Sequence, residues 1–424
     1  MGLGPPVRAS STEALSFSES QGSRSAQQQV ARVAELRKFH EAFAWFRSHA
    51  RELEDLQLEV TSIAAPPWGE AARSAWLKAR FSDLALTDVH QDELGNVFGL
   101  RPGTDPNAPY IALSAHIDTV FPPGTAIEAR RDAGKLYGPG VSDNSSGIVA
   151  LLGIAGAMQA ANLSNAAPIL FIGDVGEEGE GNLRGMRHIF QQPKWSAIVS
   201  LVVLDGAGTD TIITEGLGSR RYEVTVRGHG GHSWSDFGVA NPIIALARII
   251  DRFTRTPAPT LPKTTYNIGM INGGTSVNSI PESATMKVDT RSASVEQLDR
   301  LESALHEAVD AVIPELTGRK KQELLTAEVR MIGNRPAADL PAESQLLKAI
   351  RAVDAQLNNA ARIQRASTDA NVPLSLGREA IAIGAGGSGG GAHTIGEWYD
   401  PTGRDLGLKR ILLLILALAG VADE

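Results

Sequence analysis

Apolar side chains follow helical spacing in some stretches of the chain and strand-like spacing in others. From Val30 to Val60 they recur at steps of three and four residues, which predicts an amphipathic helix ending before Pro66-Pro67. Similar spacing predicts helices at 71–84, at 148–161 and at the C-terminal end. Short apolar runs bounded by turn residues predict buried strands at 94–100, 110–114, 169–173, 201–204 and 380–383. Buried strands that alternate with helices are typical of an α/β fold with a mostly parallel central sheet and helices on both faces.

The pattern changes between residues 217 and 332, where half-exposed alternation replaces continuous apolar runs. The elements predicted there are strand, helix, strand, strand, helix and strand, at 221–226, 242–253, 266–271, 284–289, 295–312 and 327–332. This order is that of a ferredoxin-like α+β sandwich. We therefore expect an α/β domain formed by 28–216 and 333–424, an inserted smaller domain at 217–332, and a flexible polar tail at 1–27.

Composition narrows the class of protein. The chain has 40 Lys and Arg against 48 Asp and Glu, a net charge of -8, so it lacks the basic surface expected of a nucleic-acid-binding protein. It has no Cys, so any metal must be held by His, Asp and Glu. The first 27 residues lack the apolar core of a signal peptide, and the apolar run at 411–422 is too short to span a bilayer. We expect a cytoplasmic protein that does not bind membranes.

Side chains able to bind metal follow the predicted strands, and in α/β proteins function concentrates beyond the carboxyl ends of strands. These candidates are His116 and Asp118, Asp143 at the start of a helix, Glu177 and Glu178, Asp205, and His393. Two histidines and three carboxylates suit a pair of divalent ions such as zinc, cobalt or manganese. Glu177, which is not needed as a ligand, then suits the role of general base.

Each signal has an ordinary structural explanation when it is taken alone. A His-x-Asp pair is common by chance, and Glu177-Glu178 could be a solvated surface pair. Asp205 could be an Asx-turn residue, and His393 could be a hydrogen-bonded core histidine. What favours the metal site is that the candidates follow buried strands one after another in chain order.

Five motifs give the chain a resemblance to a known family. They are Ser114-Ala-His-Ile-Asp-Thr-Val120, Gly138-Pro-Gly-Val-Ser-Asp-Asn-Ser-Ser-Gly147, Gly176-Glu-Glu-Gly179, Gly228-His-Gly-Gly-His-Ser-Trp234 and Gly273-Gly-Thr-Ser-Val-Asn-Ser-Ile-Pro281. From about residue 30 to the C-terminus the chain resembles the dinuclear-zinc exopeptidases and deacylases that include peptidase T, carboxypeptidase G, aminoacylase and acetylornithine deacetylase. The resemblance implies a zinc-exopeptidase catalytic domain, and a lid and dimerisation role for the inserted domain.

Matched motif by motif, the resemblance also implies roles for the candidates. One metal would be held by His116, Asp143 and Asp205, and the other by Asp143, Glu178 and His393, so that Asp143 bridges the pair. Asp118 would hydrogen-bond the second ring nitrogen of His116 and fix its tautomer. Glu177 would act as base, and later as acid, on a metal-bridging water. The Asp143-Asn144 peptide bond would be cis.

Three further residues lie in the inserted segment. By resemblance, His232 would reach across a homodimer interface to stabilise the oxyanion, and Arg291, assisted by Asn278, would bind a substrate carboxylate. Taken alone, His232 could be a turn histidine bonded locally, and Arg291 a surface ion-pair residue.

The resemblance implies hydrolysis of amide bonds in short peptides or similar small molecules. Asp205 favours an aminopeptidase of the peptidase T type, because the family's carboxypeptidases and deacylases usually have Glu there. An N-acyl amino acid deacylase or a carboxypeptidase with the same dinuclear site is the alternative. A non-catalytic scaffold would have lost at least one ligand, and none is missing.

Overall fold

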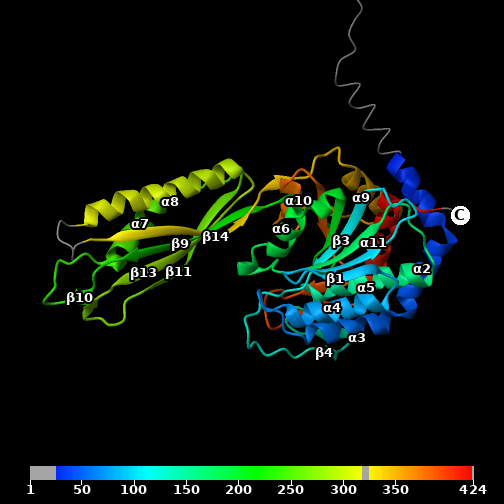
Figure 1. The fold of residues 1–424 in the computed structure, drawn as a ribbon, viewed down its shortest axis with the longest axis horizontal. Coiled ribbons are helices and arrows are strands. Elements are labelled where there is room, and N and C mark those ends of the chain that lie inside the picture. Colours follow the sequence, from blue (N-terminus) through cyan, green and yellow to red (C-terminus); the bar gives the residue numbers. More distant parts are fainter. Residues whose placement is uncertain (1–24, 318–323, 423–424) are drawn as a thin grey trace, which may run out of the picture. The chain divides into compact units, whose positions relative to one another are not determined.

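A computed structural model describes residues 25–317 and 324–422 (Figure 1). The chain divides into two compact units, of which one contains the residues up to Thr214 together with those from Asp339 onward, and the other is Glu215–Ala338. The segment expected as an insertion, 217–332, lies within the second unit, whose last strand continues to Arg335. Most of the tail expected at 1–27 lies outside the described residues, and 25–27 belong to a helix.

The larger unit is organised around a mixed sheet that has nine strands in the described part of the chain. Its order is β1-β2-β6-β3-β7-β17-β8-β15, with β16 paired to β8. The parallel centre consists of β6 (Ile169–Asp174), β3 (Tyr110–His116), β7 (Ile198–Leu204) and β17 (Glu379–Ile383). The strands β2 (Val97–Arg101), β1 (Thr87–Gln91) and β8 (Thr211–Gly216) pair antiparallel on its two sides. The expected α/β class is confirmed, with the parallel arrangement limited to the four central strands.

Helices cover both faces of this sheet, and for this reason β3 and β6 are buried along almost their whole lengths. Helices α5 (Ser145–Ala160) and α11 (Arg404–Ala419) contact β3 and each other, and α9 (Gln345–Gln356) contacts β17 and α11. Helix α10 (Asn371–Ser375) contacts β17 and α6 (Arg184–Gln191), and α4 (Ala71–Asp83) contacts β1 and β2. Helix α11 contains most of the apolar C-terminal run, and no helix in the described residues is long and apolar enough to cross a membrane.

The N-terminal region differs from its prediction. Instead of one helix from Val30 to Val60, residues 25–35 are helical and are followed by α2 (Arg37–Ser48) and α3 (Ala50–Thr61). Leu36 is extended, with ψ 131°, and His49 leaves the helical region, with φ -106° and ψ 14°. Apolar spacing describes the buried face and continues across both breaks, so it could not reveal them.

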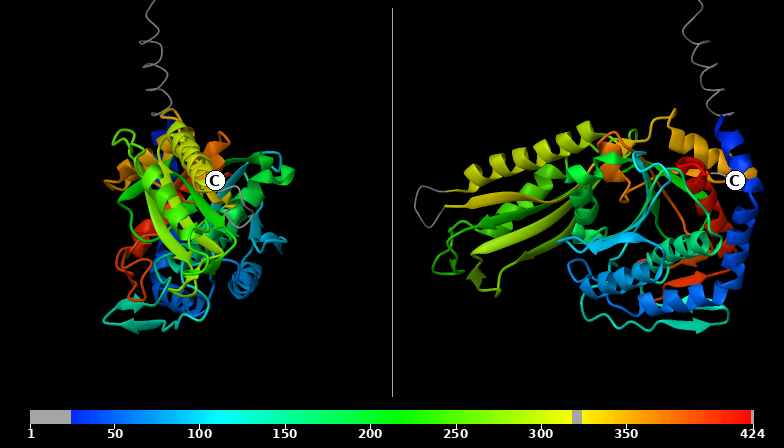
Figure 2. Two further views of the ribbon diagram at one scale, coloured as in Figure 1. Left: turned by 90° about the vertical axis from the view of Figure 1, so that its left-hand side faces the viewer. Right: turned by 45° about the vertical axis from the view of Figure 1, so that its right-hand side comes forward.

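The smaller unit is a four-stranded antiparallel sheet covered by two helices. Its strands are β9 (Gly218–Arg227), β11 (Thr264–Gly273), β13 (Ser283–Ser292) and β14 (Thr326–Arg335), in the order β11-β13-β9-β14. Helices α7 (Pro242–Phe253) and α8 (Val295–Leu316) pack against each other and against this sheet, as Figure 2 shows for α8 in yellow. Their contact buries an apolar core that includes Val224, Leu246, Phe253, Met286 and Leu305. This is the ferredoxin-like order that the sequence predicts.

Short strands complete both units. In the larger one, β18 (Ser388–Gly390), β19 (Trp398–Asp400), β5 (Lys135–Tyr137) and β4 (Arg130–Asp132) form a separate small sheet, and β15 (Ala338–Asp339) and β16 (Arg362–Ala366) extend the main sheet. In the smaller one, β10 (Gly231–His232) pairs with β12 (Ser279–Ile280). The pairing of β5 with β19 matters for the site, because it holds the segment just before Asp143 against the segment just after His393.

Candidate metal centre

The five side chains proposed as metal ligands converge in the larger unit. Ligand atoms of His116, Asp143 and Asp205 lie within 4.8 Å of one another, and the same is true of Asp143, Glu178 and His393. Asp143 belongs to both groups. Its Oδ1 lies 3.0 Å from Nε2 of His116, and its Oδ2 lies 3.2 Å from Nε2 of His393. A carboxylate whose two oxygens face separate histidines has the geometry of a bridging ligand, so this donor set fits two divalent cations.

The electrostatics of the two histidines fit the same conclusion. Burial alone would lower the pKa of His116, but the facing carboxylates of Asp118, Asp143 and Asp205 raise it well above its ordinary value. Hydrogen bonds to Asp143 and Glu178 raise the pKa of His393 to about 10. Nε2 of each histidine therefore faces carboxylates that favour a positive charge at that point, which is what a cation site requires.

Local structure explains where Asp143 and Asp205 point. The Asp143-Asn144 peptide bond is cis, as the resemblance implied. The Asn144 side chain donates from Nδ2 to the carbonyl oxygen of Leu204 at 2.8 Å, and its Oδ1 accepts the N–H of Gly206 at 3.2 Å. Asn144 thus holds the backbone on both sides of Asp205 while it follows Asp143 in the chain, so it connects the segments of two proposed ligands.

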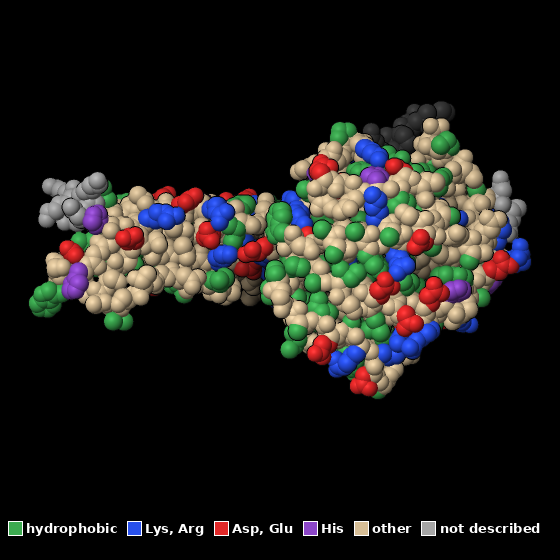
Figure 3. All heavy atoms as spheres, turned by 60° about the horizontal axis from the view of Figure 1, so that its bottom comes forward, with side chains coloured by type: hydrophobic (Ala, Val, Ile, Leu, Met, Phe, Trp, Pro, Cys, Tyr) green, Lys and Arg blue, Asp and Glu red, His purple; other side chains and the backbone are tan. Residues whose placement is uncertain are grey.

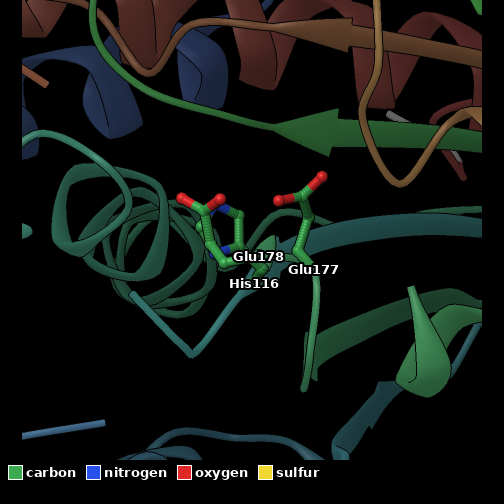
Figure 4. Close-up of side chains that lie close together, drawn as sticks. All are labelled: His116, Glu177 and Glu178. Carbon is green, nitrogen blue, oxygen red and sulfur yellow. The ribbon is translucent and has the colours of Figure 1, made fainter. Parts of the chain in front are cut away.

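Glu177 and Glu178 follow β6 and point to the same side, with His116 next to Glu178 (Figure 4). Both glutamates are buried. Burial raises the pKa of Glu178, although His393 acts in the opposite direction. Oε1 of Glu178 lies 3.1 Å from Nε2 of His393. Glu177 belongs with His116 and Glu178 to a third group of side chains that could hold a metal ion, so its carboxylate lies beside the proposed ligands.

Asp118 contacts the site in a way that the sequence did not predict. Its carboxylate accepts the backbone N–H of Glu177 at 3.0 Å and of Glu178 at 2.9 Å. Nδ1 of His116 lies 3.7 Å from the Asp118 carboxylate but only 3.1 Å from the Asp118 carbonyl oxygen. Burial opposes ionisation of Asp118, but the adjacent His116 ring and the hydrogen bonds from the two N–H groups hold the pKa of Asp118 below its ordinary value. Asp118 therefore anchors the segment of the two glutamates as well as facing the histidine.

The sequence reasoning did not single out Glu397, which is fully buried four residues beyond His393. Its carboxylate accepts backbone N–H groups from Gly140, Ser142 and Asp143 at 2.7–2.8 Å. Burial raises the pKa of Glu397 to about 7, while these three hydrogen bonds favour its ionised form. No local pattern could have revealed it, because its partners are about 255 residues earlier in the chain.

A buried acid pair was also missed. Asp174, at the end of β6, and Asp369, just before α10, are both fully buried. Among the described residues their four carboxylate oxygens have no N–H or O–H donor. Burial raises the pKa of Asp174 to about 6 and that of Asp369 well above its ordinary value, and Asp174 adds to the shift of Asp369. Two adjacent carboxyl groups in this environment favour sharing a proton.

A buried positive charge lies near the carboxylates of Asp118 and Glu397. The guanidinium of Arg73, on α4, donates to the carbonyl oxygens of Ile63 and Ile117 at 2.7–3.0 Å. Burial lowers the pKa of Arg73 to about 10, and Asp118 and Glu397 act in the opposite direction, so the side chain stays protonated at neutral pH. Because Ile117 lies between His116 and Asp118, Arg73 also fixes the backbone that presents them.

In the smaller unit the structure brings together two of the three predicted residues. His232 pairs with Ser279 across β10 and β12, and the carbonyl oxygen of Asn278 accepts the N–H of Ser233 at 3.0 Å. Nδ1 of His232 accepts the N–H of Trp234 at 3.2 Å, so the neutral ring carries its proton on Nε2. The surrounding loops expose apolar groups, including Trp234 at 87% and Val277 at 103%, and Figure 3 shows apolar and His side chains at one end of this unit.

Arg291 lies elsewhere in the smaller unit. It is eight residues along β13 from Ser283, the end of that strand nearest β12, which corresponds to about 26 Å at the usual rise of a strand. Its Nε donates to Asp289 at 2.8 Å. Within one chain, therefore, Arg291 does not share a site with His232 and Asn278.

The fold and this site place the chain among metallopeptidases and related hydrolases, and comparison with known proteins identifies the group. The chain belongs to peptidase family M20/M25/M40, whose family model matches residues 112–417.

It is 26% identical over 250 residues to a probable carboxypeptidase of Aspergillus oryzae, covering 53% of this chain and 57% of that protein. It is 34% identical over 139 residues to the N-carbamoyl-L-amino-acid amidohydrolase of Paenarthrobacter aurescens, covering 32% and 29%. The chain thus spans less than two thirds of the length of these curated relatives. A tripeptidase structure from Staphylococcus aureus shares the fold, with a TM-score of 0.71 and 20% identity over 87% of this chain and 98% of that one.

Proposed function

We propose that this protein is a metal-dependent hydrolase of amide bonds in small substrates, and specifically an aminopeptidase acting on short peptides. The observation that carries this proposal is the position of Asp143 between His116 and His393, with Glu177 beside them. We assign His116, Asp143 and Asp205 to one metal ion and Asp143, Glu178 and His393 to the other. Zinc is our first choice, and cobalt or manganese would suit the same donors.

Two bound cations would polarise the carbonyl of the scissile amide and make a water easier to deprotonate. The residues of the chain then divide the proton transfers. Glu177 takes a proton from the attacking water and delivers it to the leaving amine, which is the work of a general base followed by a general acid. Its burial excludes bulk water from this exchange, and the Asp118 carboxylate fixes its backbone.

Two features support an aminopeptidase over its relatives. Asp205 occupies the position where the family's carboxypeptidases and deacylases usually have Glu. A tripeptidase is also among the proteins that share the fold. The second candidate is a carboxypeptidase or N-acyl or N-carbamoyl amino acid hydrolase, which is favoured by the names of the curated relatives. A guanidinium such as Arg291 suits a free substrate carboxylate, which those substrates carry.

One panel of substrates separates these candidates. The metal-loaded protein is given one tripeptide in four forms: free at both ends, N-acetylated, C-amidated, and cut down to its N-acetyl or N-carbamoyl amino acid. An aminopeptidase cleaves the free and C-amidated peptides and spares the N-acetylated one. A carboxypeptidase cleaves the free and N-acetylated peptides and spares the C-amidated one, and a deacylase cleaves only the acyl or carbamoyl amino acid. If no form is cleaved with zinc, cobalt or manganese, the protein is a scaffold and the proposal is wrong.

We further propose that the protein acts as a homodimer through the smaller unit, with His232 of one subunit donating from Nε2 to the oxyanion in the other. The exposed apolar groups around His232 and the proton on its Nε2 support this. The test is complementation between His232→Ala and Glu177→Ala subunits. An exchanged mixture should regain up to about a quarter of the wild-type activity, because only some mixed sites contain both groups. A mixture as inactive as either parent would show that His232 does not act in trans.

A further inference from the structure

Most backbone N–H groups of the loop that contains Asp143 donate hydrogen bonds to one residue, Glu397. Residues 138–143 read Gly-Pro-Gly-Val-Ser-Asp, and Pro139 has no N–H. The N–H of Val141 donates within the loop, to the Gly138 carbonyl oxygen. All four others donate to Glu397: Gly138 to its carbonyl oxygen at 3.1 Å, Gly140 to Oε2 at 2.8 Å, and Ser142 and Asp143 to Oε1 at 2.7 and 2.8 Å.

The same short segment also presents His393. The N–H of Thr394 donates to the Gly391 carbonyl oxygen, and the N–H of Glu397 donates to the Thr394 carbonyl oxygen, so consecutive turns connect His393 to Glu397. Immediately after Glu397, β19 pairs with β5, Trp398 opposite Tyr137. One segment therefore provides a histidine that faces Oδ2 of Asp143 and a carboxylate that fixes the Asp143 backbone.

We propose that Glu397 is a positioning residue that sets the bridging carboxylate of Asp143 at the correct distance from both histidines. This rests on the proposed function, because it concerns the ligand shared by the two proposed metal ions. Glu397 touches neither substrate nor metal in this assignment. It acts through the backbone of residues 140–143, in the way that hydrogen-bond partners of metal ligands commonly determine affinity.

The carboxylate form is needed because its two oxygens accept three backbone N–H groups. In Glu397→Gln, Oε1 can still accept the N–H of Ser142 and Asp143. The new NH₂ group would face the N–H of Gly140, so that one hydrogen bond is replaced by two opposed donors. The chain offers a matched control in Glu379, whose carboxylate accepts the N–H of Gln345 and Leu346 at 2.9 and 3.0 Å. Glu379 begins β17, whereas the proposed ligands follow the other ends of the parallel strands.

The experiment compares the wild type, Glu397→Gln and Glu379→Gln, each stripped of metal and titrated with Zn²⁺ in a calorimeter. Glu397→Gln should bind zinc about 10–100-fold more weakly, the usual effect of removing such a partner, and its Co²⁺ form should have an altered visible spectrum. Glu379→Gln should lower the unfolding temperature without changing either readout. This contrast separates positioning from general destabilisation.

Unchanged zinc affinity and an unchanged Co²⁺ spectrum in Glu397→Gln would overturn the inference, and so would equal losses in both variants. If the wild type binds no metal, the proposed function fails instead, so the two failures are distinguishable. Should Glu397→Gln not fold, Glu397→Asp decides. It keeps the charge but is one methylene too short to reach Gly140 and Asp143 together, so the same loss of affinity is expected, and wild-type affinity would contradict the proposal.

Discussion

Replacing Asp118 by Asn tests how the site is held together. The Asp118 carboxylate is buried and accepts two backbone N–H groups, from Glu177 and Glu178. An asparagine has almost the same shape but keeps only one acceptor oxygen, so one N–H would face an NH₂ group. The substitution therefore changes hydrogen bonding while it preserves packing.

The magnitude follows from these contacts. A hydrogen bond to a charged group contributes about 1.5–3 kcal/mol, and one of two is lost while the other becomes neutral. We therefore expect the affinity for the metal held by Glu178 to fall about 10–100-fold, which corresponds to about 1.4–2.8 kcal/mol. Turnover should fall as well, because the same segment positions Glu177. The affinity at the His116 metal should change less, since the Asp118 carbonyl oxygen, 3.1 Å from Nδ1, is unaffected.

The assay is a calorimetric metal titration in which the two binding steps are identified beforehand. His393→Ala marks the step that involves Glu178, and Asp205→Ala marks the step that involves His116. If Asp118→Asn weakens the step marked by Asp205→Ala and leaves the other intact, then Asp118 acts through the imidazole. That result would refute our interpretation of the two N–H contacts.

Two further substitutions address the base and the buried acid pair. Glu177→Gln should lower turnover about 10²–10⁴-fold with metal content unchanged, as measured by elemental analysis and initial rates; metal loss with full activity per metal would contradict the role of base. The pKa of Asp174 is raised by burial to about 6 in the folded protein, against 3.8 unfolded, so its contribution to stability is greatest at low pH and is lost as the pH rises through 6. Asp174→Asn should therefore stabilise the metal-stripped protein relative to wild type at pH 8, by on the order of 1–3 kcal/mol, and by less at pH 5. Urea unfolding at both pH values measures this, and a difference independent of pH would exclude it.

Local patterns predicted the fold well where burial is continuous. Helix α7 has the predicted bounds, Pro242–Phe253, because its apolar face is regular and Asn241 caps it. The strands β1, β4 and β5 were not predicted, since they are short and partly exposed and their apolar content resembles that of loops. Such short strands are specified by the strands with which they pair, which a single segment of sequence does not reveal.

The proposed metal ligands could be found from sequence for a simple reason. Each lies next to an element whose pattern is visible: Asp143 just before helix α5 and the others at or beyond the ends of buried strands, and parallel strands bring their carboxyl ends to one edge of a sheet. Asp174 and Asp369 show the limit of this reasoning. Asp174 also ends a strand, but its partner is almost 200 residues later in the chain, and only the folded protein shows that the two are buried together.

The residues that hold the proposed ligands in place share one physical property. Asp118, Asn144 and Glu397 all accept backbone N–H groups of the segments that present Glu178, Asp205 and Asp143. A hydrogen bond to the backbone fixes a segment whatever its side chains are, so the ligand positions are set before any cation is bound. Pre-formed geometry reduces the entropy lost on binding and favours ions whose preferred distances match the site. For this reason we expect substitutions at the backbone acceptors to alter metal preference, and substitutions at the ligands themselves to abolish binding.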